Sequence, residues 1–190
     1  MSAVLEDPPP DPALTALEAE LWATLGTAVH TRGHPWRTAT LATVTPAGEP
    51  DARTVVLREA DPAARLLCFY TDARSPKVAQ MQQQPLGLLV LWSAELGWQL
   101  RLQVQLTVET SGLAVSSRWA RLQMTPAAQD YLSPLPPGSP LTTPAPASRT
   151  RVHFAVVEAR VLHMDWLDLA AAGHRRAGFG ADGAAHWLQP

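Results

Sequence analysis

Three strand-like segments follow one another in the first half of the chain, with no helical segment between them. Residues 38–44 and 53–58 are rich in Thr and Val, and residues 65–71 form a mostly apolar run. Turn-forming residues separate them, at residues 46–50 and at Asp61-Pro62. Parallel strands need a crossover of about a dozen residues or more, so strands joined by turns this short pair antiparallel. The pattern predicts an antiparallel sheet.

Further strand and helix patterns follow. Alternating or continuous apolar residues predict strands at residues 86–92, 99–110 and 152–161. Apolar spacing and Asp-Pro or Ser-Pro starts predict helices at residues 11–33, 75–84 and 113–123. Two short segments, at residues 174–179 and around Trp187, close the chain. The sequence therefore predicts a mainly β fold with peripheral helices, an α+β protein whose six or seven antiparallel strands form a closed or nearly closed β-barrel.

Length and proline content indicate the domain organisation. A chain of 190 residues suits one domain, which we place at residues 11–190. Residues 1–10 contain three consecutive prolines and are expected to form a flexible arm. Residues 133–149 are proline-rich and are expected to form a loop.

Charge, cysteine content and apolar run length exclude several classes of protein. The net charge of −2 argues against a nucleic-acid partner. The longest apolar run, residues 86–92, is too short to cross a membrane, and the N-terminus lacks the pattern of a secretory signal. The single cysteine, Cys68, excludes an internal disulfide, and a helix-breaking Gly33 separates His30 from His34, so no metal site is expected. We expect a cytoplasmic protein with no membrane partner.

Residues 70–77 concentrate groups that bind phosphate. They include hydroxyl side chains, Arg74 and Lys77, the only lysine among 15 basic residues. Ser75-Pro76 predicts the start of a helix, where free N–H groups and the helix dipole favour an anion. A capped surface helix is the alternative interpretation of the same residues. Arg53 and Arg58 are five residues apart on a predicted strand, so their side chains should point to opposite faces.

Several segments, taken in order, resemble one known family. They are Arg53-Thr54-Val55-Val56-Leu57-Arg58, Phe69-Tyr70-Thr71-Asp72 with Arg74-Ser75-Pro76-Lys77, Trp98-Gln99-Leu100-Arg101, and Trp166 with His174-Arg175-Arg176. In order and spacing they resemble the pyridoxamine 5′-phosphate oxidase-like family of FMN-binding split barrels, from about residue 36 to the C-terminus. The resemblance is closer to the FMN-binding relatives of the oxidase than to the oxidase itself.

The resemblance implies FMN as cofactor, a homodimer that shares two flavin sites, and a small-molecule substrate. Arg53 and Lys77 would bind the FMN phosphate with Ser75 and Thr71. Gln99, Trp166 and Arg176 would approach the flavin across the dimer interface, and Arg58, Arg121 and His174 would hold a substrate; no catalytic side chain is assigned. The expected cofactor-binding residues are Arg53, Val55, Val56, Leu57, Arg58, Tyr70, Thr71, Arg74, Ser75, Lys77, Gln99, Trp166 and Arg176.

The chain departs from the family where the substrate phosphate would bind. Ser117 replaces a tyrosine and Ala172 an arginine, while Pro76 replaces a cofactor-site arginine, a loss that Arg74 would offset. The leading hypothesis is an FMN-dependent oxidoreductase that transfers a hydride to flavin N5, with reoxidation by oxygen or another acceptor. The alternatives are a non-catalytic flavin-binding store or sensor, and a split barrel that binds haem or a deazaflavin.

Overall fold

The computed structural model describes residues 11–140, 142, 153–170 and 173–190. The predicted arm at residues 1–10, much of the proline-rich loop, and Ala172 lie outside these ranges. The helices are α1 (Pro12–His30), α2 (Pro76–Gln83) and α3 (Leu113–Leu122), with short 3-10 helices η1 (Pro35–Arg37) and η2 (Pro126–Tyr131). The strands are β1 (Thr38–Val44), β2 (Pro50–Asp61), β3 (Leu66–Asp72), β4 (Leu86–Ser93), β5 (Trp98–Glu109), β6 (Phe154–Asp168), β7 (Arg175–Gly180) and β8 (Ala185–Leu188).

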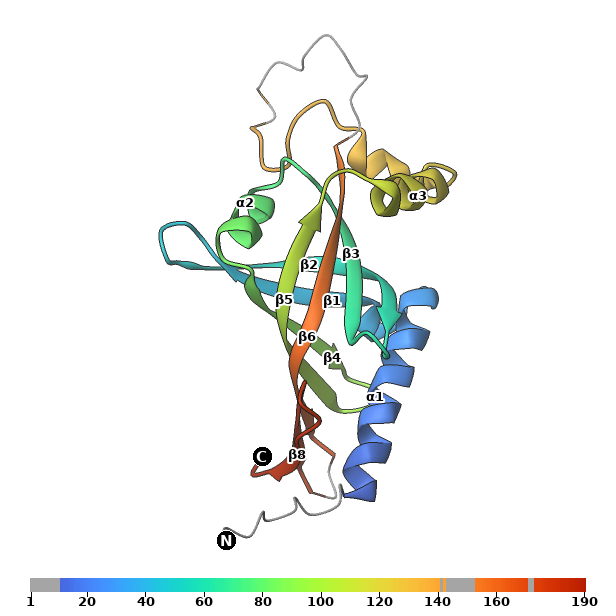
Figure 1. The fold of residues 1–190 in the computed structure, drawn as a ribbon, viewed down its shortest axis with the longest axis vertical. Coiled ribbons are helices and arrows are strands. Elements are labelled where there is room, and N and C mark those ends of the chain that lie inside the picture. Colours follow the sequence, from blue (N-terminus) through green and yellow to red (C-terminus); the bar gives the residue numbers. More distant parts are fainter. Residues whose placement is uncertain (1–10, 141, 143–152, 171–172) are drawn as a thin grey trace, which may run out of the picture.

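The strands form a closed barrel with a two-strand extension (Figure 1). Their order is β3-β2-β1-β4-β5-β6-β7-β8, every pairing is antiparallel, and a further pairing of β3 with β6 closes the first six into a ring. Closure leaves no exposed edge among those six strands. The predicted antiparallel β-barrel is confirmed, and β7 and β8 form a hairpin that extends from β6.

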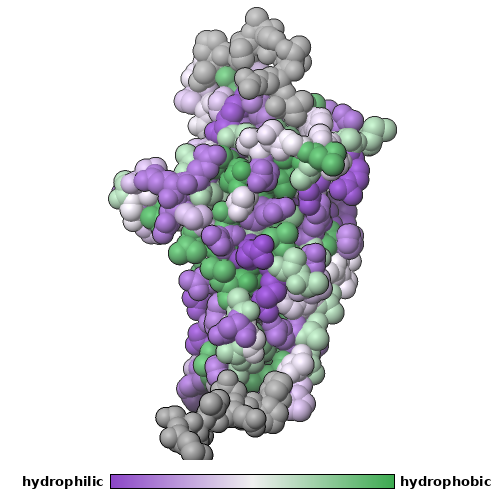
Figure 2. Space-filling view, in the orientation of Figure 1, coloured by the Kyte–Doolittle hydropathy of each residue, from purple (hydrophilic) through white to green (hydrophobic). Residues whose placement is uncertain are grey.

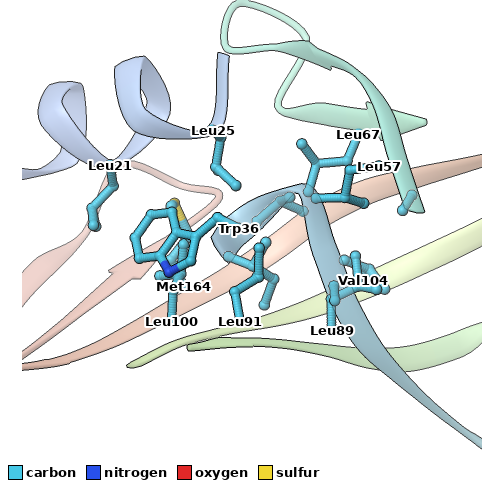
Figure 3. Close-up of a cluster of buried hydrophobic side chains, with 14 of the residues drawn as sticks. Leu21, Leu25, Trp36, Leu57, Leu67, Leu89, Leu91, Leu100, Val104 and Met164 are labelled. Atoms are coloured by element: carbon cyan, nitrogen blue, oxygen red, sulfur yellow. The ribbon is translucent and has the colours of Figure 1, made fainter. Parts of the chain in front are cut away.

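Helix α1 closes the barrel core on one side. Its start is fixed by Asp11, whose side chain accepts a hydrogen bond from the backbone N–H of Ala13 at 2.8 Å, and by Pro12 at the first helical position. Leu21 and Leu25 of α1 have no exposed surface and point toward Trp36 and the barrel interior (Figure 3). Burying one such leucine contributes about 1.5–3 kcal/mol. In the part of the chain that the structure describes, no helix is long and apolar enough to cross a membrane.

A second, smaller core attaches α3 and η2 to the outside of the barrel. It contains Val115 and Leu122 of α3, Tyr131 of η2, and Phe154 and Val156 of β6. Edge-to-face contact between Tyr131 and Phe154, at 5.3 Å between ring centroids, belongs to this cluster. The cluster therefore fixes α3 near one end of β3 and β6 (Figure 1).

Strand β6 is longer than the sequence indicates. The predicted strand ended at Val161, but pairing with β5 continues to Asp168. Val161 pairs with Val104 and His163 with Gln103, so Leu162 is an extra residue in the ladder. A bulge of this kind shifts the alternation of buried and exposed side chains by one residue. The simple alternating pattern consequently breaks at Leu162, although the strand does not.

Candidate anion and cofactor site

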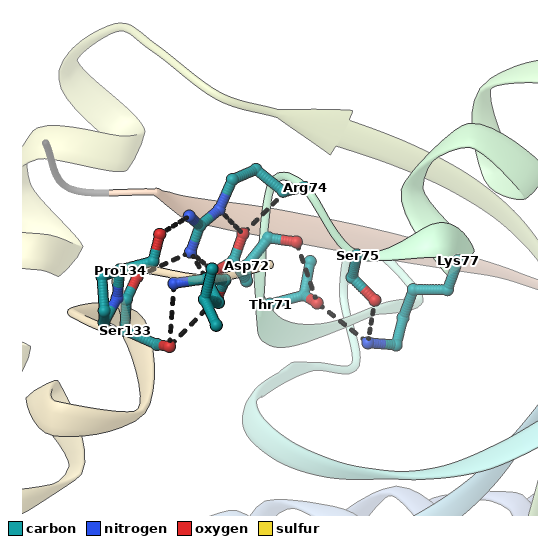
Figure 4. A network of polar contacts seen from close by, with 8 residues as sticks. Thr71, Asp72, Arg74, Ser75, Lys77, Ser133 and Pro134 are labelled. Atoms are coloured by element: carbon teal, nitrogen blue, oxygen red, sulfur yellow. Dashed lines mark hydrogen bonds and ion pairs between the residues drawn. The ribbon is translucent and has the colours of Figure 1, made fainter. Parts of the chain in front are cut away.

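The Lys77 side chain lies in surroundings that favour a bound anion. Its ammonium donates hydrogen bonds to Thr71 Oγ1 and Ser75 Oγ, both at 3.0 Å (Figure 4). The side chain is half-buried, and no described acidic residue forms an ion pair with it. Burial lowers the pKa of the Lys77 ammonium, and the neighbouring charge of Arg53 lowers it further. The carboxylates of Asp72 and Asp51 oppose this lowering only in part, so a bound anion would supply further counter-charge.

Arg53 forms the second charged wall of this site. Its guanidinium contacts the Asp51 carboxylate and the Thr43 hydroxyl, and donates to Gln80 Oε1 at 2.8 Å. Gln80 in turn donates to Asp51 Oδ2 at 2.8 Å. The Gln80 amide, and next the charge of Arg53, lower the pKa of the Asp51 carboxyl. This network fixes Arg53 in place and joins β2 to α2.

A cavity of about 280 Å³ lies between these groups. It is lined by Asp51, Arg53, Ser75, Pro76, Lys77, Pro137 and Gly138. Its charged residues are two cations and one carboxylate, so the cavity is electropositive when empty. A phosphate monoester carries about −1.5 to −2 charges near neutral pH and accepts several hydrogen bonds. The residues present therefore fit a phosphate group, as the sequence of residues 70–77 predicts.

The Arg74 side chain, predicted to bind the cofactor, points away from the Lys77 cavity in the folded chain. Asp72 accepts from Arg74 Nε at 3.0 Å and from Nη2 at 2.6 Å (Figure 4). The remaining donors reach backbone carbonyls of Ser133, Pro134 and Leu135 at 2.9–3.2 Å. Arg74 is thus used in holding a loop, and it does not line the cavity.

The residues expected beside the flavin ring divide between two faces. Val55 and Leu57 are buried in the barrel core, whereas the side chain of Val56 is half-buried on the opposite face. Tyr70 donates from its hydroxyl to Glu59 at 3.1 Å, away from the cavity, and Arg58 lies 5.8 Å above the Tyr70 ring. The prediction that Arg53 and Arg58 reach different surroundings agrees with this geometry.

Gln99, Trp166 and Arg176 form a separate group near the other end of β6. Gln99 and Arg176 both pair with Leu167, whereas Thr71 pairs with Ala155. Ala155 and Leu167 are twelve residue steps apart, which corresponds to about 40 Å along the strand. One chain therefore does not bring this group to the Lys77 cavity (Figure 1).

Trp166 and Arg176 differ in their access to a ligand. Trp166 has no exposed surface and packs edge-to-face against Trp98, so its predicted flavin contact finds no support in the folded chain. Arg176 is partly exposed and forms two hydrogen bonds with Asp165, at 2.9 and 2.6 Å.

A groove of about 490 Å³ crosses the outer face of β1, β4, β5 and β6. It begins near Thr43 and Pro50, next to the Arg53 network, and reaches Asp165, the partner of Arg176. No described helix contributes to its lining. Its rim includes exposed Val44 and Leu86, and Figure 2 shows apolar residues interspersed with hydrophilic ones on the face over β5 and β6.

The three expected substrate residues do not converge in one chain. Arg58 is half-buried near Tyr131, and Arg121 is exposed on α3 at the same end of the barrel. His174 is exposed at the start of β7, near the opposite end.

Two residues that contact Arg58 or Glu59 of β2 were not identified from the sequence. Arg118 of α3 forms a two-pronged ion pair with Glu59, at 2.8 and 2.6 Å. Tyr131 lies close to Arg58 and has its pKa raised by burial. An arginine three residues before Arg121 was a visible signal for the first, but nothing in the sequence links Tyr131 to a strand 73 residues earlier.

Comparison with known proteins agrees with this architecture. Residues 19–110, just under half of the chain, match the family model of the pyridoxamine 5′-phosphate oxidase FMN-binding domain. Over residues 19–110 the chain matches the pyridoxamine 5′-phosphate oxidase-like family of FMN-binding split barrels, the family that the sequence motifs resemble. FMN is accordingly the cofactor, as predicted from the sequence. The family resemblance of the sequence motifs is confirmed.

Related proteins of this family match over part or all of the chain. Pyridoxine/pyridoxamine 5′-phosphate oxidases from Nostoc punctiforme and Gloeothece citriformis are 46% and 44% identical over 63 and 64 residues. These matches cover 33% and 34% of this chain but only 28% and 29% of the relatives. The chain thus matches less than a third of the length of these curated oxidases.

Two crystal structures share the fold over almost the whole chain. One is a pyridoxamine 5′-phosphate oxidase-related, FMN-binding protein from Nostoc punctiforme, with TM-score 0.72 and 24% identity over 96% of this chain and 100% of that chain. The other is PhzG from Burkholderia lata in complex with tetrahydrophenazine-1-carboxylic acid, with TM-score 0.70 and 20% identity over 100% and 98% of the two chains.

Proposed function

We propose that this split-barrel protein is an FMN-dependent oxidoreductase. The observation that carries the proposal is the Lys77 cavity, where a half-buried ammonium has two hydroxyl partners and no carboxylate among the described residues. Bound FMN would supply hydride acceptance at N5 and reoxidation by oxygen or another acceptor. The protein would supply affinity, orientation and control of access.

Each residue around the cavity has a distinct task in this proposal. Lys77 donates to the FMN phosphate and carries the charge that offsets it, while Ser75 and Thr71 hold the ammonium in position. Arg53 contributes a second positive charge from the cavity wall, held by Asp51 and Gln80.

The flavin site is proposed to be shared between two copies of the chain. Gln99 and Arg176 are too far along β6 from Thr71 to contact the same flavin within one chain, and a second copy would supply them. The groove over β1, β4, β5 and β6 runs between the two groups and is free of helices, so it is the face we assign to this interface. A two-fold dimer would then contain two equivalent sites.

A phosphorylated pyridoxine or pyridoxamine is the first substrate candidate, because Arg58 and Arg121 lie at one end of the barrel and the matching relatives are oxidases of those compounds. The second candidate function is flavin binding without turnover. Arg118 is neutralised by Glu59, and His174 lies near the other end of the barrel. These observations favour weak recognition of a substrate phosphate.

The two functions are separated by a turnover assay. FMN-loaded protein is mixed with pyridoxamine 5′-phosphate or pyridoxine 5′-phosphate in air, and hydrogen peroxide and pyridoxal 5′-phosphate are measured. Production of both in equal amounts supports the oxidase. FMN-loaded protein that forms neither product is a flavin-binding protein for which these vitamers are not substrates.

A further inference from the structure

We infer that Arg74 is a positioning residue that holds the loop wall of the phosphate cavity and thereby sets the preference for FMN over riboflavin. The inference rests on the proposed function, since it concerns how the same cavity recognises the phosphate. It assigns to Arg74 a role that involves no contact with the cofactor.

The first step is the clip that Arg74 forms between β3 and the loop after η2. One end of the clip is Asp72, whose side chain is 3% exposed and which accepts from Nε, Nη2 and the backbone N–H of Arg74. The other end consists of the carbonyls of Ser133, Pro134 and Leu135. The flat guanidinium meets all these acceptors at once, which a lysine ammonium with its single nitrogen does not.

A short turn connects the part of the loop that Arg74 holds with the wall of the cavity. Residues 136–139 form a turn, in which Ser139 N–H donates to Pro136 O at 3.2 Å and Gly138 has a φ of +85°. Pro137 followed by a glycine at positive φ is typical of a type II turn. Two prolines directly after the clip restrict the backbone, so fixing Leu135 also fixes Pro137 and Gly138 against Lys77.

The charges of the clip and the charges that attract phosphate belong to different residues. Arg74 and Asp72 neutralise each other, so the clip adds no net charge to the cavity. Lys77 and Arg53 carry the attraction for phosphate, and Pro137 and Gly138 of the loop shape the cavity beside them. A flavin without phosphate gains nothing from this wall, so loss of the clip should affect FMN and leave riboflavin unchanged.

The test compares FMN and riboflavin affinities of flavin-free protein by quenching of flavin fluorescence. In Arg74→Ala we expect FMN affinity to fall about tenfold, equivalent to about 1.4 kcal/mol, with riboflavin affinity changed less than about twofold. Arg74→Lys should also lose most of the preference for FMN over riboflavin, because lysine keeps the positive charge but lacks the several N–H donors of the planar guanidinium. Arg32→Ala, which removes an exposed arginine elsewhere, should bind like the wild type.

Removing Arg74 has two effects: it releases the loop, and it leaves the Asp72 carboxylate near Lys77 without its partner. A double variant separates the effect of the released loop from the effect of the unpaired charge. Asp72→Asn combined with Arg74→Ala should still show weak FMN binding, because the loop remains released. If the double variant regains the wild-type preference for FMN, then repulsion between the Asp72 carboxylate and the FMN phosphate explains the weak binding of Arg74→Ala. The positioning role of Arg74 is then overturned. Pro137→Gly leaves the clip intact and loosens the wall, so it should also lower the preference and provides the test if Arg74→Ala does not fold.

Failure of the inference can be told apart from failure of the proposed function. If Lys77→Met loses FMN selectively while Arg74→Ala and Pro137→Gly keep the wild-type preference, the phosphate site stands and the clip is overturned. If the wild type binds FMN no better than riboflavin, the phosphate cavity and the clip are both wrong.

Discussion

At the scale of single residues, Lys77 is the group on which the account depends. Its ammonium is half-buried beside Arg53 and is held by two hydroxyl groups, Thr71 and Ser75. Neither hydroxyl can neutralise a positive charge. The arrangement is costly without an anion and favourable with one, as expected for a binding site and not for a stabilising contact.

Replacement of Lys77 should therefore separate binding from stability. In Lys77→Met we expect FMN affinity to fall about ten- to a hundredfold, since a hydrogen bond to a charged group contributes about 1.5–3 kcal/mol. The free energy of unfolding of the flavin-free protein should stay the same or rise, because a half-buried charge is removed. Fluorescence titration and urea unfolding measure the two quantities, and an unchanged FMN affinity would show that the phosphate site is misplaced.

The protonation of Lys77 should limit FMN binding at high pH. Because the pKa of Lys77 is lowered in the folded flavin-free protein, FMN affinity should begin to fall at a pH below the ordinary value of about 10.4. It should also fall below about pH 6, where the phosphate gains its second proton. Lys77→Met should lack the high-pH decline. A decline of equal size and position in that variant would contradict the assignment.

At the scale of elements, the ion pair between Glu59 and Arg118 attaches α3 to β2. Arg118 and then Tyr70 lower the pKa of the Glu59 carboxyl by hydrogen bonding. A carboxyl with a lowered pKa in the folded state contributes stability above its unfolded pKa, and this contribution disappears as the pH falls through the folded value. The contact should therefore stabilise α3 at neutral pH and release it in acid.

The corresponding variant is Arg118→Ala. We expect the free energy of unfolding at pH 7 to fall by about 1 kcal/mol, a modest figure because the Glu59 side chain is 36% exposed. The difference between wild type and variant should begin to shrink as the pH falls below the ordinary glutamate pKa of 4.5, and should disappear as the pH falls through the lower pKa of Glu59 in the folded protein. Urea unfolding at several pH values provides the measurement, and a difference that does not vary with pH would exclude the ion pair as its source.

Most elements could be predicted from the sequence, and the exceptions have physical reasons. The Asp-Pro start and the apolar spacing of α1, and the Ser-Pro start of α2, are local signals that the fold retains. The predicted strand at residues 152–161 ends before β6 does, because the bulge at Leu162 interrupts the alternation of buried and exposed side chains. The sequence predicts Arg74 as a cofactor-binding residue because it stands between Thr71 and Lys77. Its partners are instead Asp72 and backbone carbonyls some 60 residues away, and no local pattern indicates these carbonyls.

At the scale of the whole molecule, closure of the barrel places the two groups of expected flavin residues far apart. Lys77 and Thr71 lie beside the start of β6, and Gln99 and Arg176 lie beside its end. The family resemblance already implies that Gln99 and Arg176 approach the flavin from a second copy, but sequence order alone gives no distance between the two groups. The separation along β6 is the structural observation that supports a complete site formed between two copies.

Mixing two defective variants tests that proposal. If Lys77 and Arg176 serve one flavin from different copies, a dimer of Lys77→Met with Arg176→Ala has one intact site and one site with both defects. Refolding the two variants together in equal amounts should restore about a quarter of the wild-type FMN sites by random pairing. Each variant refolded alone is the control, and a mixture that binds no more FMN than the controls would place both residues in sites within single chains.

The central claim is that this split barrel holds FMN by its phosphate, and the most direct measurement is the visible absorption spectrum of the purified protein with mass analysis of whatever heat releases. The account predicts a flavin spectrum and a released molecule with the mass of FMN. A colourless protein that added FMN fails to reconstitute would contradict it.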